Sequence, residues 1–355
     1  MLFTASTVKD SPENTRFFVA ANLASGVDHM VVFLDDPRDP VQQDVAAELA
    51  AHPHVTCIPT DRAWWQGDRP NRLNVRQRIN ANLVVALLAD VPDAQWVVHV
   101  DGDEVVHADA DALASVPPDT GALWLSPLEA VSTLEAPQRP TLFKRLLEAE
   151  DLQLLTVLGV LDAPTNQAYF HGHVLGKSGV RPRAGLHLTL HDSVHPDGRR
   201  LRSPERFEHP GLSVLHYDAV SGQEFIRKWT AMVAAGPTSL RPDRAPVAMA
   251  LRSLVGKGLD PAVAETYLRA VYERTTQDAV ETLADLRLLE QVDPTLGTHR
   301  PAELSAATRS ALEQGLDRLR EEPKRPFHIN HSEPEAAEEA GTLDRLRRRI
   351  GRSQA

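Results

Sequence analysis

The chain has 355 residues, of which 42% are hydrophobic and 25% are charged, and its formal net charge at pH 7 is −11. This length and hydrophobic content suffice for a sizeable core in one large domain or two modest ones. The acidic balance excludes general binding of nucleic acid, which needs a basic face to release counterions from phosphates.

The sequence predicts a protein without a membrane span. No stretch approaches the roughly 20 consecutive apolar residues that cross a bilayer, and the N-terminus lacks the charged start of a signal peptide. The lone cysteine, Cys57, lies in a predicted strand and cannot form an internal disulfide, which suits a reducing cytoplasm. The basic run Arg347, Arg348 and Arg349 is compatible with a peripheral contact to anionic lipid, although a short charged tail is usually only solvated.

The first hundred residues alternate between the apolar patterns of strands and of helices. Strands are predicted at Leu2–Val8, His29–Leu34, Val55–Pro59 and 96–100, and helices at 13–24, 41–51 and 75–88. Alternation of this kind is typical of an α/β fold with a mainly parallel central sheet that helices cover on both faces.

The remaining two thirds of the chain change in character. Between residues 127 and 210, His, Gly, Pro and Arg are frequent, and we expect loops and short strands there. A last strand is predicted at 212–217, and helices are predicted at 221–234, within 260–292 and at 305–319. Residues 331–355 have the composition of a disordered tail. The C-terminal part is therefore expected to be a helical extension of the α/β domain.

Three carboxylates follow the predicted strand at 96–100, namely Asp101, Asp103 and Glu104. Carboxylates so close together repel one another, and either a divalent cation with oxygen ligands or a raised pKa must relieve the repulsion. An Asp-Gly-Asp run at a strand end is also an ordinary solvated turn. Its place after the fourth strand of an alternating pattern favours a functional role.

Polar residues also follow the first two predicted strands. Lys9 and Asp10 come after the first strand, and Asp35 and Asp36 come after the second. Ligands of parallel sheets bind where the carboxyl ends of the strands meet. We therefore expect these residues to converge on one crevice with the acidic run at 101–104, although Asp35 and Asp36 also fit a solvated turn.

In combination, these segments resemble glycosyltransferases of the A-type (GT-A) fold, in particular family 2-like and family 92-like enzymes. The run at 101–104 is similar to the metal-binding Asp-x-Asp-Glu motif of that family, and Gln77 and Asn80 lie in the helix before it, as in the family. The later matching segments are 176–182 and His216 and Tyr217 with Ser221, Phe225 and Lys228. The resemblance covers about residues 2–230. The chain departs from it at Asp10, where the family often has Asn.

The resemblance implies a Rossmann-like GT-A domain at residues 1–235, with a nucleotide-binding half at 1–105 and an acceptor half at 106–235. A helical extension at 236–330 and the tail would follow. The implied activity is transfer of a sugar from a nucleoside-diphosphate sugar to a hydroxyl of a glycan or other acceptor, with inversion. The implied cofactor is Mn²⁺ or Mg²⁺.

The resemblance also implies roles for individual residues. Asp103 would bind the metal directly, Asp101 would contact the ribose or a metal-bound water, and His216 would be a third metal ligand. The nucleotide sugar would contact Lys9, Asp10, Asp35, Asp36 and Asp101, with Lys177 and Arg181 neutralising the phosphates. The sequence lacks the clean acidic pair that supplies the base in many family 2 enzymes, and Asp192 is the candidate for that base.

Other interpretations of the sequence stay open. A zinc site could form from His171, His173, His187 and His191, because two residues separated by one face the same side of a strand. A nucleotidyltransferase also uses carboxylates and magnesium at a sheet edge. A non-catalytic protein that binds nucleotide sugars or carbohydrates would keep the fold without the base.

Overall fold

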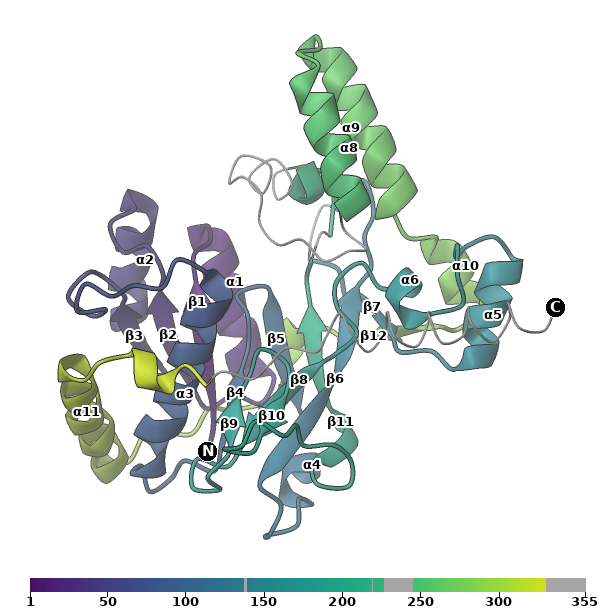
Figure 1. Ribbon diagram of the computed structural model, residues 1–355. Helices are drawn as coiled ribbons and strands as arrows, with labels where there is room; N and C mark the ends of the chain where they lie inside the picture. Colours follow the sequence, from purple (N-terminus) through teal and green to yellow (C-terminus); the bar gives the residue numbers. More distant parts are fainter. Residues whose placement is uncertain (137–138, 219, 227–244, 330–355) are drawn as a thin grey trace, which may run out of the picture.

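The computed structural model describes residues 1–136, 139–218, 220–226 and 245–329 (Figure 1). Its first part alternates as predicted, with elements β1 (Leu2–Val8), α1 (Pro12–Ala24), β2 (His29–Leu34), α2 (Pro40–Ala50), β3 (Val55–Pro59), α3 (Leu73–Ala89) and β4 (Trp96–His99). These strands are parallel and lie in the order β4-β1-β2-β3. The predicted α/β fold is confirmed, and three of its strands have the predicted bounds.

Both faces of this parallel half are covered, which explains why its strands are continuously apolar. Side chains alternate between the faces, so that Phe3 and Ala5 of β1 pack in the same core as α3. Leu2 and Val8 face the other way, toward the core that contains Phe18 of α1. The helices of the two faces therefore fix the position of each strand end.

The second half of the sheet is mixed. It consists of β5 (Glu104–Ala108), β6 (Ala122–Ala130), β7 (Leu142–Arg145), β8 (Lys177–Val180), β11 (Phe207–His216) and β12 (Leu289–Gln291). Strand β8 lies antiparallel between β4 and β6, and β11 lies between β5 and β6. The short strands β9 (His187–Leu188) and β10 (Ser193–Val194) form a separate hairpin. The helices α4 (Ala110–Ala114), α5 (Ala149–Val157) and α6 (Asn166–Tyr169) connect these strands.

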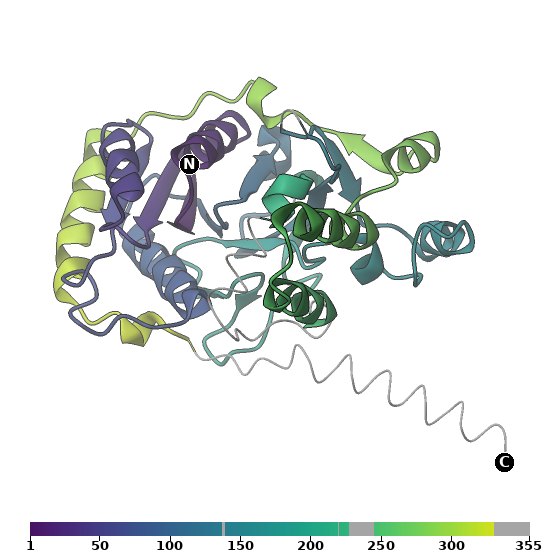
Figure 2. The same ribbon diagram turned by 90° about the horizontal axis from the view of Figure 1, so that it is seen from above.

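The C-terminal helices occupy three separate places. Helices α8 (Ala245–Gly256) and α9 (Pro261–Thr275) form a hairpin that projects from the body of the protein (Figure 1). The chain then forms α10 (Val280–Asp285), and β12 pairs with β7 at the edge of the sheet. From there it crosses to the opposite end of the molecule through η1 (Pro294–Leu296), where α11 (Ala306–Glu321) packs on α3 (Figure 2). A short turn, η2 (Arg325–Phe327), follows α11.

The predicted helical extension is confirmed, with one correction. Residues Leu289–Gln291, which we expected to be helical, form the edge strand β12, because pairing with β7 satisfies their backbone. The predicted helix at 221–234 begins as expected, with residues 222–226 helical. Its remainder, Lys228 and the predicted tail at 331–355 lie outside the described residues. The domain boundaries stay predictions.

None of the helices in the described part of the chain has the length and apolar character needed to cross a membrane.

Packing of α11 on α3 gives a first testable prediction. Leu312 is buried in the core that α3 shares with β1, so we expect Leu312→Ala to lower the free energy of unfolding by about 2–4 kcal/mol. The matched variant Glu313→Ala changes an exposed residue of the same helix and should shift stability by about 0.5 kcal/mol or less. Urea denaturation measures both. An unchanged midpoint for Leu312→Ala, or a separate transition for α11, would contradict the packing.

Candidate metal centre

The centre of the candidate site is a buried lysine that lies between two carboxylates. Lys177 Nζ donates to Asp101 Oδ2 over 2.7 Å and lies 2.9 Å from Glu104 Oε2, and its side chain is fully buried. The amide of Asp101 donates to the same Glu104 oxygen over 2.8 Å. Lys177 begins β8, so the antiparallel insertion of β8 beside β4 is what carries its ammonium to the end of β4.

Electrostatics oppose the effect of burial on Lys177 and Glu104. Burial alone would lower the pKa of Lys177, but the carboxylates of Asp101 and Glu104 raise it above its ordinary value. Burial alone would raise the pKa of Glu104, but Lys177 and then His173 hold it well below the usual range. The repulsion that the sequence predicts at 101–104 is therefore relieved in part by a lysine from a distant strand.

Asp103 lies on the other side of this run, next to the end of β11. Its Oδ2 is 3.9 Å from Nε2 of His216, and its backbone carbonyl accepts from the Tyr217 amide over 2.8 Å. Asp218 follows two residues after His216, and one ligand atom from each of Asp103, His216 and Asp218 lies within 4.8 Å of the others. These three side chains could hold a metal ion, and the roles of Asp103 and His216 as its ligands stay predictions. Asp101, which was also expected near the metal, is not part of this group.

Asp218 is a candidate ligand that sequence reasoning missed. The signal was present, because a His-x-Asp run lies at the end of the strand predicted at 212–217, much as the Asp-x-Asp run lies at the end of the strand predicted at 96–100. Pairing of β11 with β5 brings the two runs together, with His216 opposite Glu104 in the register.

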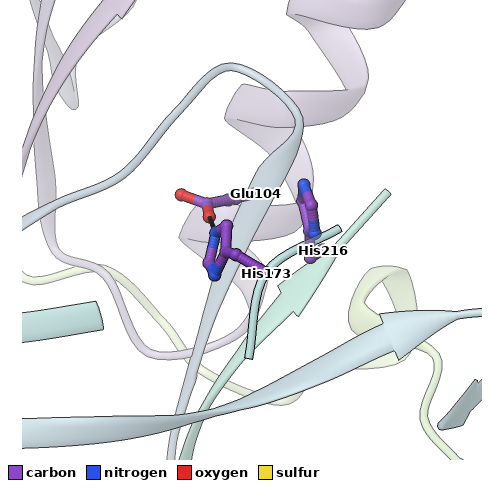
Figure 3. Close-up of side chains that lie close together, drawn as sticks. All are labelled: Glu104, His173 and His216. Atoms are coloured by element: carbon purple, nitrogen blue, oxygen red, sulfur yellow. Dashed lines mark hydrogen bonds and ion pairs between the residues drawn. The ribbon is translucent and has the colours of Figure 1, made fainter. Parts of the chain in front are cut away.

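A second group of possible metal ligands is buried and shares His216 with the group of Asp103, His216 and Asp218. Glu104, His173 and His216 also offer three ligand atoms within 4.8 Å of one another (Figure 3). His173 Nε2 lies 3.0 Å from Glu104 Oε1, and the rings of His173 and His216 are stacked with centroids 4.9 Å apart.

The segment that carries His173 is held by a second buried ion-pair network. Glu129 accepts from the amides of His171 and Gly172, and Lys144 Nζ lies 2.8 Å from it. Lys144 is fully buried and also contacts Asp278 at 3.0 Å. A side chain at Gly172 would overlap the His216 ring. This network therefore fixes His173 and His216 relative to each other.

The residues expected to bind the nucleotide take different places at the ends of β1 and β2. Asp35 is buried and accepts from Nε and Nη2 of Arg76 over 2.7 and 2.6 Å, so its carboxylate is already paired inside the protein. Asp36 and Lys9 form an exposed ion pair of 3.0 Å, and the hydrogen bond from Lys9 lowers the pKa of Asp36. Asp10 accepts from its neighbours at the start of α1.

Asp101 lies at the same edge, where Gln77 of α3 donates a hydrogen bond to it. Arg181 does not lie at this edge. Because β8 runs antiparallel to β4, Arg181 lies at the opposite end of β4 from Asp101. There its guanidinium stacks on Trp96 at 4.1 Å. Its contact with phosphate stays a prediction, and the site proposed below does not include it.

The candidate base, Asp192, is engaged by arginines. Its carboxylate lies 2.6 Å from Arg202 and 3.3 Å from Arg200, and it is nearly buried beside the β9–β10 hairpin. A general base needs a carboxylate oxygen free to accept the proton of the acceptor. The role of Asp192 stays a prediction, and these ion pairs count against it.

The four histidines considered for a zinc site do not form one group. His171 pairs with Asp278 at 3.0 Å, whereas the rings of His173 and His191 contact each other with centroids 4.1 Å apart. Within the described ranges, the candidate metal groups are the two that share His216.

The buried network around Lys144 gives a prediction for acid stability. Burial alone would raise the pKa of Asp278, but Lys144 and His171 lower it to about 2. A carboxyl with a depressed folded-state pKa stabilises the fold above its unfolded value near 4, and that contribution is lost as the pH falls. We expect this group to account for about 1 kcal/mol of lost stability between pH 5 and pH 3.

Urea denaturation over this pH range tests the effect. Asp278→Asn should be less stable than wild type at pH 7, because Lys144 loses a partner, but its stability should fall less steeply with acid. Asp285→Asn, a change at an exposed aspartate of α10, should keep the wild-type slope. A slope for Asp278→Asn equal to that of wild type would contradict the assignment.

Comparisons with known proteins identify no family. No family model matches the sequence, and no curated protein matches it. Among the solved structures that match is the apo structure of the WbbM bifunctional glycosyltransferase, at 14% identity and a TM-score of 0.23. The match covers 52% of this chain and 31% of that one, so the chain spans less than a third of that protein. A likeness of this extent identifies neither the family nor the activity of the chain.

Proposed function

We propose that the protein is a metal-dependent glycosyltransferase that moves a sugar from a nucleoside-diphosphate sugar to an acceptor hydroxyl. The observation that carries the proposal is the meeting of Asp103 with His216 and Asp218. This group lies at the edge of the sheet where the carboxyl ends of β1, β2 and β4 come together. That edge is where open α/β sheets bind their ligands.

The donor set suits a divalent cation that also binds a diphosphate. Two carboxylates and one imidazole match the preferences of Mn²⁺, and Mg²⁺ accepts the carboxylates together with phosphate oxygens. Asp103 is about one third exposed, so the group is open to a ligand, whereas the His216 side chain is nearly buried. When bound, the ion would neutralise the negative charge that develops on the leaving diphosphate.

The chain's own residues would position the donor beside the ion. Gln77 and Lys177 hold Asp101 in a fixed orientation, so that it can accept from a ribose hydroxyl or a bound water. Lys9 and Asp36 are exposed at the neighbouring strand ends, where the ribose and the phosphates of a nucleotide would lie. Lys9, with about half of its side chain exposed, can turn from Asp36 toward a phosphate.

A second candidate function is non-catalytic binding of a nucleotide sugar. The ion pairs of Asp192 with Arg200 and Arg202 favour it, because they occupy the carboxylate expected to act as the base. Both candidates predict metal-dependent binding of nucleotide. Manganese-dependent release of nucleoside diphosphate from a nucleotide sugar, with or without acceptor, occurs only if the protein is an enzyme.

Calorimetric titration of UDP and of GDP tests the proposed site. With MnCl₂ present, we expect one of the two to bind, and chelation by EDTA should abolish the binding. Asp103→Asn and Asp218→Asn should each weaken it by roughly 10- to 100-fold, since each removes a charged ligand. Asp111→Asn, a change at an exposed aspartate of α4, is the matched control and should bind as wild type does.

Two results would contradict the site. Binding of neither nucleotide in the presence of manganese would remove the donor-site proposal. Binding that persists in both Asp103→Asn and Asp218→Asn would place the nucleotide elsewhere on the protein.

A further inference from the structure

The group formed by Glu104, His173 and His216 shares His216 with the open metal group and is buried in the interior of the protein. All three residues are at least nine-tenths buried, and they come from β5, from the segment before β8 and from the end of β11 (Figure 3). Their ligand atoms lie within 4.8 Å of one another. The group is thus assembled by tertiary structure and not by a local sequence motif.

The ligand chemistry of the two groups differs. Asp103, His216 and Asp218 offer mainly hard carboxylate oxygens, which suit Mg²⁺ and Mn²⁺. Glu104, His173 and His216 offer two imidazoles and one carboxylate, a set that zinc sites use with a fourth position left open. The buried group therefore favours a transition-metal ion over Mg²⁺.

The surroundings of Glu104 can accommodate an added positive charge. Lys177 and the Asp101 amide hold Oε2 of Glu104, while Oε1 faces His173. Lys177 is shared between Asp101 and Oε2 of Glu104, so it does not occupy Oε1. A cation beside Oε1 would therefore meet a carboxylate oxygen whose hydrogen-bond partner is His173.

The two histidines also have unused buried nitrogens. Among the described residues, Nδ1 of His173 and Nδ1 of His216 are buried and have no hydrogen-bond partner. Buried polar atoms are normally satisfied, and exceptions often mark a missing water or ion. The ring of His191 packs against the ring of His173, with centroids 4.1 Å apart.

We propose that Glu104, His173 and His216 form a second metal position, selective for a transition-metal ion such as Zn²⁺. We also propose that an ion there withdraws His216 from Asp103 and Asp218. A neutral imidazole has one free lone pair, so the shared histidine binds one ion at a time. The two positions therefore exclude each other, and zinc acts as an inhibitor of the open site. The exclusion of the open site rests on the proposed function, whereas the buried metal position stands without it.

Titration of ZnCl₂ alone into the metal-free, full-length protein tests the buried metal position. Wild type should bind one Zn²⁺ at this position, and His173→Gln should weaken that binding by roughly tenfold or more. Asp218→Asn should leave it unchanged, because Asp218 belongs only to the open group. His187→Gln, a change at a histidine outside both groups, is the matched control and should bind zinc as wild type does.

The outcomes of the zinc titration separate the possibilities. Zinc affinity that is unchanged in His173→Gln, or that falls in His187→Gln instead, would overturn the buried site. Zinc affinity that falls in Asp218→Asn would place the ion in the open group and would also overturn it. Urea denaturation of each variant shows whether it is folded. The absorption spectrum of the Co²⁺ form of wild type gives a readout that needs no variant, because a spectrum without nitrogen ligands would also overturn the site.

Competition between Zn²⁺ and Mn²⁺ tests whether the two metal positions exclude each other. Zn²⁺ should weaken manganese-dependent binding of the nucleotide in wild type by roughly fivefold or more, and manganese with nucleotide should weaken zinc binding by the same factor. His173→Gln should keep manganese-dependent binding of nucleotide and lose its sensitivity to zinc. If Zn²⁺ supports nucleotide binding as well as manganese does, the exclusion is wrong. If no nucleotide binds with manganese, the proposed function fails, while the zinc titration still decides the buried site.

Discussion

The site depends on the burial of Lys177 between Asp101 and Glu104. Three acidic residues at the end of one strand would repel one another, and two of them are partly or fully removed from water. One ammonium, 2.7 Å from Asp101 and 2.9 Å from Glu104, bridges the two side chains and, against the effect of burial, lowers the pKa of Glu104. Asp103 of the same run lies near the end of β11, beside His216 and Asp218.

The mixed half of the sheet supplies side chains to the edge where the strands of the parallel half end. Strand β8 carries Lys177, and β11 carries His216 and the aspartate that follows it, to the edge where β1, β2 and β4 end. The buried pair of Glu129 and Lys144 then fixes the segment that carries His173. Asp278 connects this pair to the chain just after the projecting α8–α9 hairpin. The C-terminal part of the chain is therefore joined to the network that holds the His173 segment by an ion pair, and to the sheet by the edge strand β12.

The sequence predicted what depends on local pattern. The bounds of β1, β2 and β3 and the acidic run after β4 follow from apolar periodicity and from the position of polar residues at strand ends, whereas His216 was expected only from the resemblance to A-type glycosyltransferases. The partners of those residues could not be predicted, because Lys177 and Asp101 are 76 positions apart and Lys144 and Asp278 are 134 apart. Local pattern also could not show that Arg181 lies at the far end of β4, since that follows from the antiparallel direction of β8. The arginines around Asp192 lie close in sequence, but their direction depends on the β9–β10 hairpin.

The central claim is that His216 and the neighbouring aspartates together bind the metal that holds a nucleotide diphosphate. Pulsed electron paramagnetic resonance of the protein with Mn²⁺ and UDP or GDP tests it most directly, because it detects the nuclei bound to or next to the ion. The account predicts a nitrogen coupling from one imidazole, absent in His216→Gln, together with a phosphorus coupling from the diphosphate. A phosphorus coupling without nitrogen, or a nitrogen coupling that survives in His216→Gln, would contradict it.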